Sequence, residues 1–276
     1  MDDTDDVAAR GDLEPLIAQI ERERGVDLAQ YRTSYVERRL GTRLRVLGLT
    51  TYREYSDYLN LHHTEYARLL DVLTVNVTDF FRDPPVWDVI RERVIPEILA
   101  HKAATGHHAV RAWSAGCATG EEPYSIAMAF LAAKGPKPER MLLSVAATDL
   151  DPLALKTAAR AEYDIAKIEH IPATERARFV TADERRFRIN AEVTERVRFK
   201  TLDLFTDEPP RALDLIMCRN VFIYFTREQQ ERVTGVFRRA LTKGGHLVLG
   251  HTERMATEET SHFEAVSGRE RIYRKV

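Results

Sequence analysis

One stretch of the chain, Ala109–Ser125, restricts the possible folds more than any other. An apolar run ends at Trp113, a turn with Gly116 and Gly120 follows, and an amphipathic segment begins at Glu121. This order predicts a strand, a tight turn and a helix. Glycines in such a turn let the backbone approach a ligand closely, because no Cβ stands in the way. The stretch therefore predicts an α/β fold with a ligand-binding turn after a strand.

The chemistry of this turn argues against a phosphate site. It matches neither the dinucleotide pattern G-x-G-x-x-G nor the Lys-Ser/Thr pair of a P-loop. Glu121 places a carboxylate where a phosphate would need the free N–H groups of a helix start. A loop that offers an acid suits a cationic ligand. S-adenosylmethionine, which carries a sulfonium and an ammonium, fits this requirement.

The rest of the chain divides into a helical part and an alternating part. We expect a disordered tail over 1–11, a helical domain over 12–75, an α/β domain over 76–276, and a small β insert over 171–197 within the latter. Helices are predicted over 13–24, 34–47, 51–61, 64–75, 85–102, 121–134, 152–160 and 227–241. Strands are predicted over 109–114, 141–148, 197–201, 213–219, 245–251, 263–266 and 271–275. Such alternation is typical of a mainly parallel sheet with helices on both faces, and the last two runs predict an antiparallel hairpin at its edge.

The composition is that of an ordinary globular protein and excludes several classes. The 276 residues carry a formal net charge of −2, which argues against a general nucleic-acid binder. No run approaches the roughly 20 apolar residues of a membrane span. The acidic first residues do not resemble a signal peptide, and two cysteines, Cys117 and Cys218, indicate reduced thiols. We expect a cytoplasmic monomer without a metal site, since the histidine pairs lack ligand spacing.

Polar residues at the ends of the predicted strands are candidate ligand contacts. Asp149 is placed to bind a ribose diol, while Asp151, before a proline, is a helix N-cap; the alternative for Asp149 is a second turn aspartate. Asp203 is either an adenine-side contact or a turn residue. Asn220 is a site candidate or a turn asparagine, and Tyr224 is a site residue or a core aromatic.

A separate polar cluster, Asn76-Val-Thr-Asp-Phe-Phe-Arg82, precedes the predicted sheet. The planar guanidinium of Arg82 can hold a carboxylate. The alternative is a linker with a surface arginine.

Five strings in this order resemble one family. They are Asn76-Val-Thr-Asp-Phe-Phe-Arg82, Ser114-Ala-Gly-Cys-Ala-Thr-Gly-Glu-Glu-Pro-Tyr-Ser125, Ala147-Thr-Asp149, Cys218-Arg-Asn-Val-Phe-Ile-Tyr224 and Gly250-His-Thr-Glu253. Together they resemble the chemotaxis receptor methyltransferases (CheR) over nearly the whole chain. The resemblance implies a Rossmann-like S-adenosylmethionine-binding domain with a small all-α N-terminal domain and a small antiparallel insert. It also implies methyl transfer to glutamates on the helical cytoplasmic domain of methyl-accepting chemotaxis receptors, with S-adenosylhomocysteine as product.

The resemblance also assigns roles to particular residues. It implies that Arg82 and Tyr224 border the transferred methyl, and we expect both to orient the acceptor. It implies cofactor contacts at Asn76, Thr78, Arg82, Ala115, Glu121, Asp149, Asp203, Leu204, Asn220 and Val221. Many relatives carry Asn where Asp203 stands. The short insert, with no glycine between Gly135 and Gly235, resembles the branch that does not tether to a receptor's C-terminal pentapeptide.

A basic segment of the helical domain is a candidate docking site for an acidic receptor helix. Arg38, Arg39 and Arg43 lie close together, and Arg39 and Arg43 share one face of the predicted helix. The alternative is an ordinary solvated basic face. Two other functions stay open at this point: methylation of a different signalling protein, and a non-catalytic module that binds S-adenosylmethionine or its product.

Overall fold

A computed structural model describes residues 13–73, 78–133, 141–255 and 257–276. The chain forms two compact units. The first comprises the described part of 1–75 together with Tyr224–Gln229, and the second comprises the described parts of 76–223 and 230–276. The tail over 1–11, which the sequence predicts to be disordered, lies outside the described residues.

The first unit is all helical, as predicted. Its elements are α2 (Leu13–Arg24), η1 (Leu28–Gln30), α3 (Thr33–Leu47), α4 (Tyr52–Leu61) and α5 (Glu65–Leu73). A reciprocal capping box between Thr51 and Glu54 starts α4, and Gly48, with a φ of 70°, ends α3. These local signals explain why the sequence predicts the element boundaries here to within one residue or two.

A short segment distant in sequence belongs to the first unit. Tyr31 forms an isolated antiparallel bridge with Phe225, and Arg32 N donates to Tyr224 O at 2.9 Å. The α/β domain expected over 76–276 is therefore not a single continuous unit. Pairing of residues almost two hundred positions apart leaves no trace in local periodicity.

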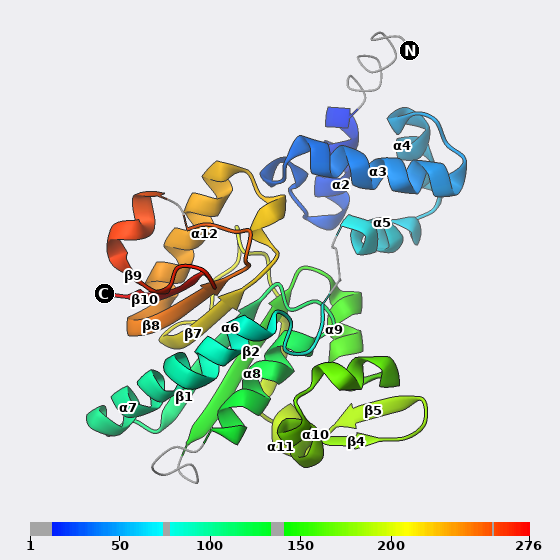
Figure 1. Cartoon of the computed structure of the whole chain (residues 1–276). Helices are drawn as coiled ribbons and strands as arrows, with labels where there is room; N and C mark the ends of the chain where they lie inside the picture. The colour runs from blue at the N-terminus through cyan, green and yellow to red at the C-terminus, as the bar shows by residue number, and fades with distance from the viewer. Residues whose placement is uncertain (1–12, 74–77, 134–140, 256) are drawn as a thin grey trace. The chain divides into compact units, whose positions relative to one another are not determined.

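The second unit is built on a seven-stranded sheet (Figure 1) with the order β6-β2-β1-β7-β8-β10-β9. Its strands are β1 (Ala109–Ala115), β2 (Leu142–Asp149), β6 (Val197–Thr201), β7 (Leu213–Cys218), β8 (Leu241–Leu249), β9 (Phe263–Ser267) and β10 (Ile272–Lys275). The first five pair in parallel, and β10 pairs antiparallel with β8 and β9. The predicted fold class, including the terminal hairpin, is confirmed.

Helices alternate with these strands along the chain, and they belong to the second unit except for Tyr224 and residues 227–229. They are α6 (Pro84–Val89), the π-helix η2 (Ile90–Val94), α7 (Ile95–Thr105), α8 (Glu121–Ala132), α9 (Pro152–Ala158), η4 (Ile165–His170), α10 (Ala173–Phe179), α11 (Ala191–Thr194), η5 (Phe222–Tyr224), α12 (Arg227–Ala240) and η6 (Thr257–His262). The helix predicted over 85–102 contains a π turn, in which Ile95 N bonds to Ile90 O. Pro96 explains it, because a proline lacks an N–H and its ring clashes with the carbonyl four residues earlier in a regular α-helix.

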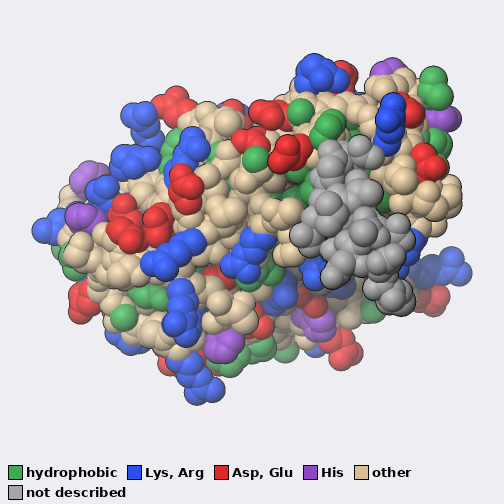
Figure 2. Space-filling model, turned by 90° about the horizontal axis from the view of Figure 1, so that it is seen from above, with side chains coloured by type: hydrophobic (Ala, Val, Ile, Leu, Met, Phe, Trp, Pro, Cys, Tyr) green, Lys and Arg blue, Asp and Glu red, His purple; other side chains and the backbone are tan. Residues whose placement is uncertain are grey.

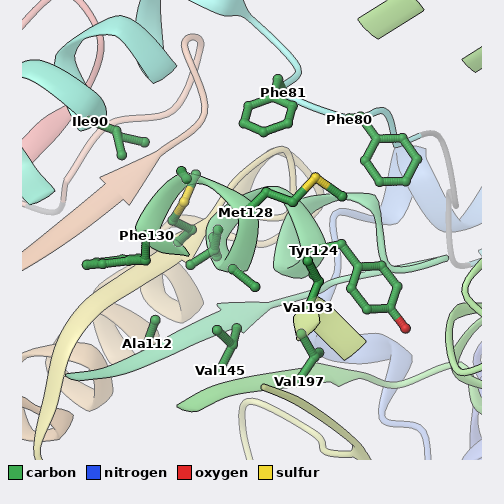
Figure 3. Close-up of a cluster of buried hydrophobic side chains, with 14 of the residues drawn as sticks. Phe80, Phe81, Ile90, Ala112, Tyr124, Met128, Phe130, Val145, Val193 and Val197 are labelled. Atoms are coloured by element: carbon green, nitrogen blue, oxygen red, sulfur yellow. The ribbon is translucent and has the colours of Figure 1, made fainter. Parts of the chain in front are cut away.

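Both faces of the sheet are covered. α8 packs on β1, β2 and β6, where Tyr124 and Met128 join Ala112 and Val145 in the main hydrophobic cluster (Figure 3). On β1 the next residue, Trp113, points the other way and meets Phe237 of α12 at 5.3 Å between ring centroids. This double cover explains why β7 is buried along its whole length.

The insert is a second sheet, with the order β3-β5-β4, formed by β3 (Glu162–Asp164), β4 (Val180–Ala182) and β5 (Arg186–Ile189). The hairpin expected within 171–197 is present, but a third strand from before residue 171 joins it. A strand of three residues carries too little alternation to be predicted from sequence.

Acidic and basic side chains are interspersed over the face shown in Figure 2. Within the residues that the structure describes, no helix is long and apolar enough to cross a bilayer.

Candidate active site

The strand order places a topological switch point between β1 and β7. The chain runs outward from β1 through β2 to β6 and then returns to β7 on the other side of β1. In open α/β sheets a ligand binds beyond the carboxyl ends of the strands at such a point. The loops that follow Ala115, Asp149 and Cys218 therefore border the candidate site.

The loop after β1 requires its glycines. Gly116 has a φ of 78°, and a Cβ there would lie 2.5 Å from Val221 Cγ2. Gly120 has a φ of 95°, and a Cβ there would lie 2.8 Å from Ala158 Cβ. Gly116 N also donates to Thr148 O at 2.8 Å. The loop after β1 is thus held against the end of β2 and against the loop after β7.

Asp149 and Asp151 have different roles. Asp151 is the N-cap of α9 and accepts from Leu153 N at 2.8 Å. Asp149 instead accepts from Ala118 N at 2.7 Å and from Asp151 N at 3.0 Å, so it joins the glycine loop to the end of β2. Its carboxylate is buried, and this burial raises its pKa above the usual value despite the backbone donors. An ionised carboxylate has about four acceptor positions, so capacity for a diol is left.

The loop after β7 is held by an acid that sequence reasoning did not single out. Asn220 has a φ of 61°, a conformation that asparagine tolerates better than most residues. Glu253 accepts from Asn220 N at 3.1 Å, Gly250 N at 2.6 Å and Ile223 N at 3.3 Å. Burial raises the pKa of Glu253. The side-chain Oδ1 of Asn220 is buried and meets no hydrogen-bond donor within the described part of the chain, so it is available to a ligand.

Arg219, also not predicted, holds the segment that carries Arg82. Its guanidinium is buried, donates to Arg82 O at 2.9 Å and pairs with Asp83. Phe81 and Asp83, the residues on either side of Arg82, both have positive φ, of 47° and 59°, which is an unusual strain for non-glycine residues. Trp87 Nε1 donates to the same carbonyl at 3.1 Å. These contacts place Arg82, which is half-buried, beside the loop after β7.

Glu121 is completely buried at the start of α8. Its Oε2 accepts from Thr119 Oγ1 at 2.7 Å, and its Oε1 pairs with Lys167 of η4. Lys167 Nζ also donates to Thr78 O at 3.3 Å. Sequence reasoning identified Glu121 and Thr78 but not the lysine that joins them, because Lys167 lies in the irregular stretch before the insert.

Asp203 and Leu204 follow β6 next to Asp149, whose carbonyl accepts from Leu202 N at 3.1 Å. Asp203 Oδ1 accepts from Phe205 N at 2.8 Å, and Asp203 N donates to Asp207 Oδ2 at 2.9 Å. This is the turn geometry that the alternative interpretation of Asp203 describes. The adenine-side contact of Asp203 stays a prediction, because the turn contacts do not decide between the two interpretations.

Tyr224 belongs to the first unit. Its ring lies 4.6 Å from that of Tyr35 between centroids, and Tyr35 is flanked by the guanidinium groups of Arg38 and Arg39 at 5.7 and 5.4 Å. Burial, with a smaller contribution from Tyr224, raises the pKa of Tyr35 to about 12. Tyr224 is half-buried, so its assignment to the reaction centre stays a prediction.

One docking residue must be corrected. Arg43 is buried, and its guanidinium pairs with the buried carboxylate of Glu65 at 2.7 Å. Tyr55 donates to the same Glu65 oxygen at 3.1 Å. Arg43 therefore packs against α5 and is unavailable to a partner, although it shares a face of α3 with Arg39. Arg38 is exposed and Arg39 is half-buried.

The structure thus gathers Ala115, Glu121, Asp149, Asn220 and Val221 around one edge of the sheet. Thr78 and Arg82 are tied to the same edge through Lys167 and Arg219, whereas Asn76 lies outside the described residues. Arg219 lies within the quoted string Cys218–Tyr224 but had no predicted role, and Lys167 lies outside the quoted strings. Among the described residues, no cluster of three or more His, Cys, Asp or Glu side chains is arranged to hold a metal ion.

Two family models match consecutive parts of the chain. The CheR methyltransferase all-alpha domain matches residues 11–74, and the CheR methyltransferase SAM binding domain matches residues 76–272. A chemotaxis protein methyltransferase of Listeria monocytogenes is 32% identical over 86% of this chain and 87% of its own length. A probable chemotaxis protein methyltransferase of Rhizobium etli is 33% identical over 88% and 92%. An uncharacterized 104.1 kDa protein of Rhodobacter capsulatus is 34% identical, but the chain spans only 26% of its length.

The fold, the glycine loop and these matches define an S-adenosylmethionine-dependent methyltransferase. The chain belongs to the CheR methyltransferase family.

The residues present fit this cofactor. Asp149 offers acceptor positions to a ribose diol, the unpartnered Oδ1 of Asn220 points to a missing donor, and the glycine at 116 removes a Cβ that would collide with Val221. Buried polar groups are normally paired, and a donor from a bound cofactor would satisfy the Oδ1 of Asn220.

Proposed function

We propose that this methyltransferase acts on glutamate side chains in the helical cytoplasmic domain of methyl-accepting chemotaxis receptors. The products would be glutamyl methyl esters and S-adenosylhomocysteine. Relatives named as chemotaxis methyltransferases, matched over most of both chains, support the pathway. The observation that carries the acceptor chemistry is Arg82, presented by a strained turn beside the switch point and held there by Arg219.

The reaction needs orientation more than acid–base chemistry. A glutamate carboxylate is already ionised near pH 7, because its ordinary pKa is about 4.3. When bound, the cofactor supplies a methyl group activated by a sulfonium. The protein then has to align a carboxylate oxygen and exclude water from it. The guanidinium of Arg82 suits this task, because its planar fork matches a carboxylate. Tyr224 is proposed to border the same centre.

Within the cofactor site, the remaining residues have proposed binding roles. Asp149 would bind the ribose, and Glu121 would bind the ammonium of the methionine end. Ala115, Asn220 and Val221 would line the cofactor between the two loops, with Asp203 and Leu204 on its adenine side. Thr78 and Asn76 are proposed contacts near the methionine end.

Arg38 and Arg39 are the proposed docking residues for an acidic receptor helix. Both lie on α3 and flank the ring of Tyr35, which in turn packs on Tyr224. Complementary charges at an exposed rim mainly affect association and specificity. The insert offers only a tight turn, in which Asp183 accepts from Arg185 N and Arg186 N at 2.8 Å each. We therefore propose no tight binding of a receptor's C-terminal pentapeptide.

The test is transfer of labelled methyl groups to a purified receptor cytoplasmic fragment. We expect label that is released as methanol by mild base, as a glutamyl ester requires. The double variant Arg38→Glu/Arg39→Glu should raise the KM for the fragment about tenfold and leave the KM for cofactor unchanged. Arg53→Glu, an exposed charge reversal on α4, is the control. Base-stable label would contradict a glutamyl ester, and equal changes in both KM values would contradict docking at α3.

A further inference from the structure

A lysine outside every motif reaches the cofactor loop. Lys167 lies in η4, 46 residues after Glu121, and pairs with the Oε1 of that fully buried carboxylate. The same ammonium donates to Thr78 O at 3.3 Å. The Lys167 side chain is 36% exposed, so it approaches the buried acid from solvent. It is therefore the link between the loop after β1 and the segment that leads to Arg82.

Glu121 and Lys167 form an ion pair next to the loop after β1. Glu121 supplies the negative charge and Lys167 the positive one, with Thr119 Oγ1 on the second carboxylate oxygen at 2.7 Å. A contact between the side chains of Asp79 and His170 joins the same two stretches of chain. A zwitterionic amino acid carries one ammonium and one carboxylate. Its ammonium is complementary to the carboxylate of Glu121, and its carboxylate is complementary to the ammonium of Lys167.

We propose that Lys167 is part of the cofactor site and binds the carboxylate of the methionine end, while Glu121 binds its ammonium. Lys167 then makes the site selective for ligands that have an intact amino-acid end. This uses the established cofactor and does not depend on the identity of the methyl acceptor. It also gives the η4 segment, which leads into the insert, a function in binding.

The experiment is calorimetric titration of the full chain with two ligands. S-adenosylhomocysteine carries the amino-acid end, and 5′-methylthioadenosine shares the adenine, ribose and thioether but lacks it. Lys167→Met should weaken S-adenosylhomocysteine about tenfold or more, as expected for loss of a charged hydrogen bond, and change 5′-methylthioadenosine by less than about twofold. Lys156→Met, at an exposed position on α9, should change neither affinity.

The ratio of the two affinities is the decisive quantity. Lys167→Gln, which keeps donors but removes the charge, provides a second folded variant if Lys167→Met is unstable, and circular dichroism checks both. Equal weakening of both ligands would overturn the proposal and leave Lys167 a structural role. Tighter binding of S-adenosylhomocysteine would also overturn it, because it would mean that Lys167 competes with the ligand's ammonium for Glu121.

Discussion

At the scale of the residue, two aspartates separated by a single residue show that one end of a strand can carry both a candidate ligand contact and a helix cap. Asp151 caps α9, whereas Asp149 bonds the glycine loop and keeps further acceptor positions. The prediction that Asp151 is the N-cap is confirmed, because a residue before proline at a helix start is an N-cap in most contexts. The ribose contact of Asp149 stays a prediction.

The matched variants Asp149→Asn and Asp151→Asn test this division. Asp149→Asn removes the charge and turns one acceptor oxygen into a donor, so the affinity for S-adenosylhomocysteine should fall about 10- to 100-fold, as for a hydrogen bond to a charged group. Asp151→Asn should leave affinity unchanged, because Asn is also a good N-cap. Calorimetric titration measures both. Equal losses in the two variants would assign Asp149 a merely structural role.

The raised pKa of Asp149 gives the same site a pH dependence. Burial favours the protonated form, so this carboxyl takes up a proton at higher pH than an ordinary aspartate. The contribution of this group to folding stability is fully present below the pKa that Asp149 has in the unfolded chain. It is lost as the pH rises through the higher pKa that Asp149 has in the folded protein. Cofactor affinity has the opposite trend, because the diol needs the ionised acceptor. It should fall as the pH is lowered toward the folded pKa, and this fall should be flatter in Asp149→Asn.

At the scale of the element, the loop between β1 and α8 shows why a local pattern was so informative. Its strand, turn and helix are consecutive in sequence, and its glycines have positive φ in the structure. The sequence indicated only one of the two reasons for a glycine at position 116, the turn. Its missing Cβ also avoids Val221, which lies more than 100 positions later.

Gly116→Ala and Gly106→Ala separate the effect of backbone strain at positive φ from the effect of a clash with Val221. Both glycines have positive φ, but a Cβ at Gly106 would have nothing within 4 Å, whereas at Gly116 it would overlap Val221. Gly106→Ala should cost about 1–2 kcal/mol of unfolding free energy, from backbone strain alone. Gly116→Ala should cost more and should also weaken cofactor binding, because the two loops must move apart. Denaturant unfolding and calorimetry measure these effects; unchanged affinity in Gly116→Ala would show that the loop adapts.

At the scale of the whole molecule, the first unit includes a segment from within the α/β sequence. Tyr224–Gln229 bonds to the chain around Tyr31, and it carries the predicted reaction-centre tyrosine. The stability of this segment should therefore follow that of the helical unit rather than that of the sheet.

Arg43→Ala is a suitable perturbation. It removes the buried cation of Glu65 and leaves only the exposed Arg68, at 3.9 Å, so it should cost about 3–5 kcal/mol. Arg38→Ala, at an exposed position on the same helix, should cost about 1 kcal/mol or less. Hydrogen–deuterium exchange should then rise in α3, α5 and 224–229 but not in β1 or β7. Unchanged exchange at 224–229 would show that this segment is held by the second unit.

The sequence by itself determined the α/β class, the helical first unit, the glycine loop and the positions of the strand-end polar residues. These depend on periodicity and turn chemistry within about 15 residues, which a single chain displays directly. Only the tertiary structure decided that Arg43 is buried, that Arg219 holds Arg82 across 137 positions, that Lys167 reaches Glu121, and that Tyr224 joins the first unit. Such partners are chosen by packing and by the need to compensate buried charge, and neither has a local signature in sequence.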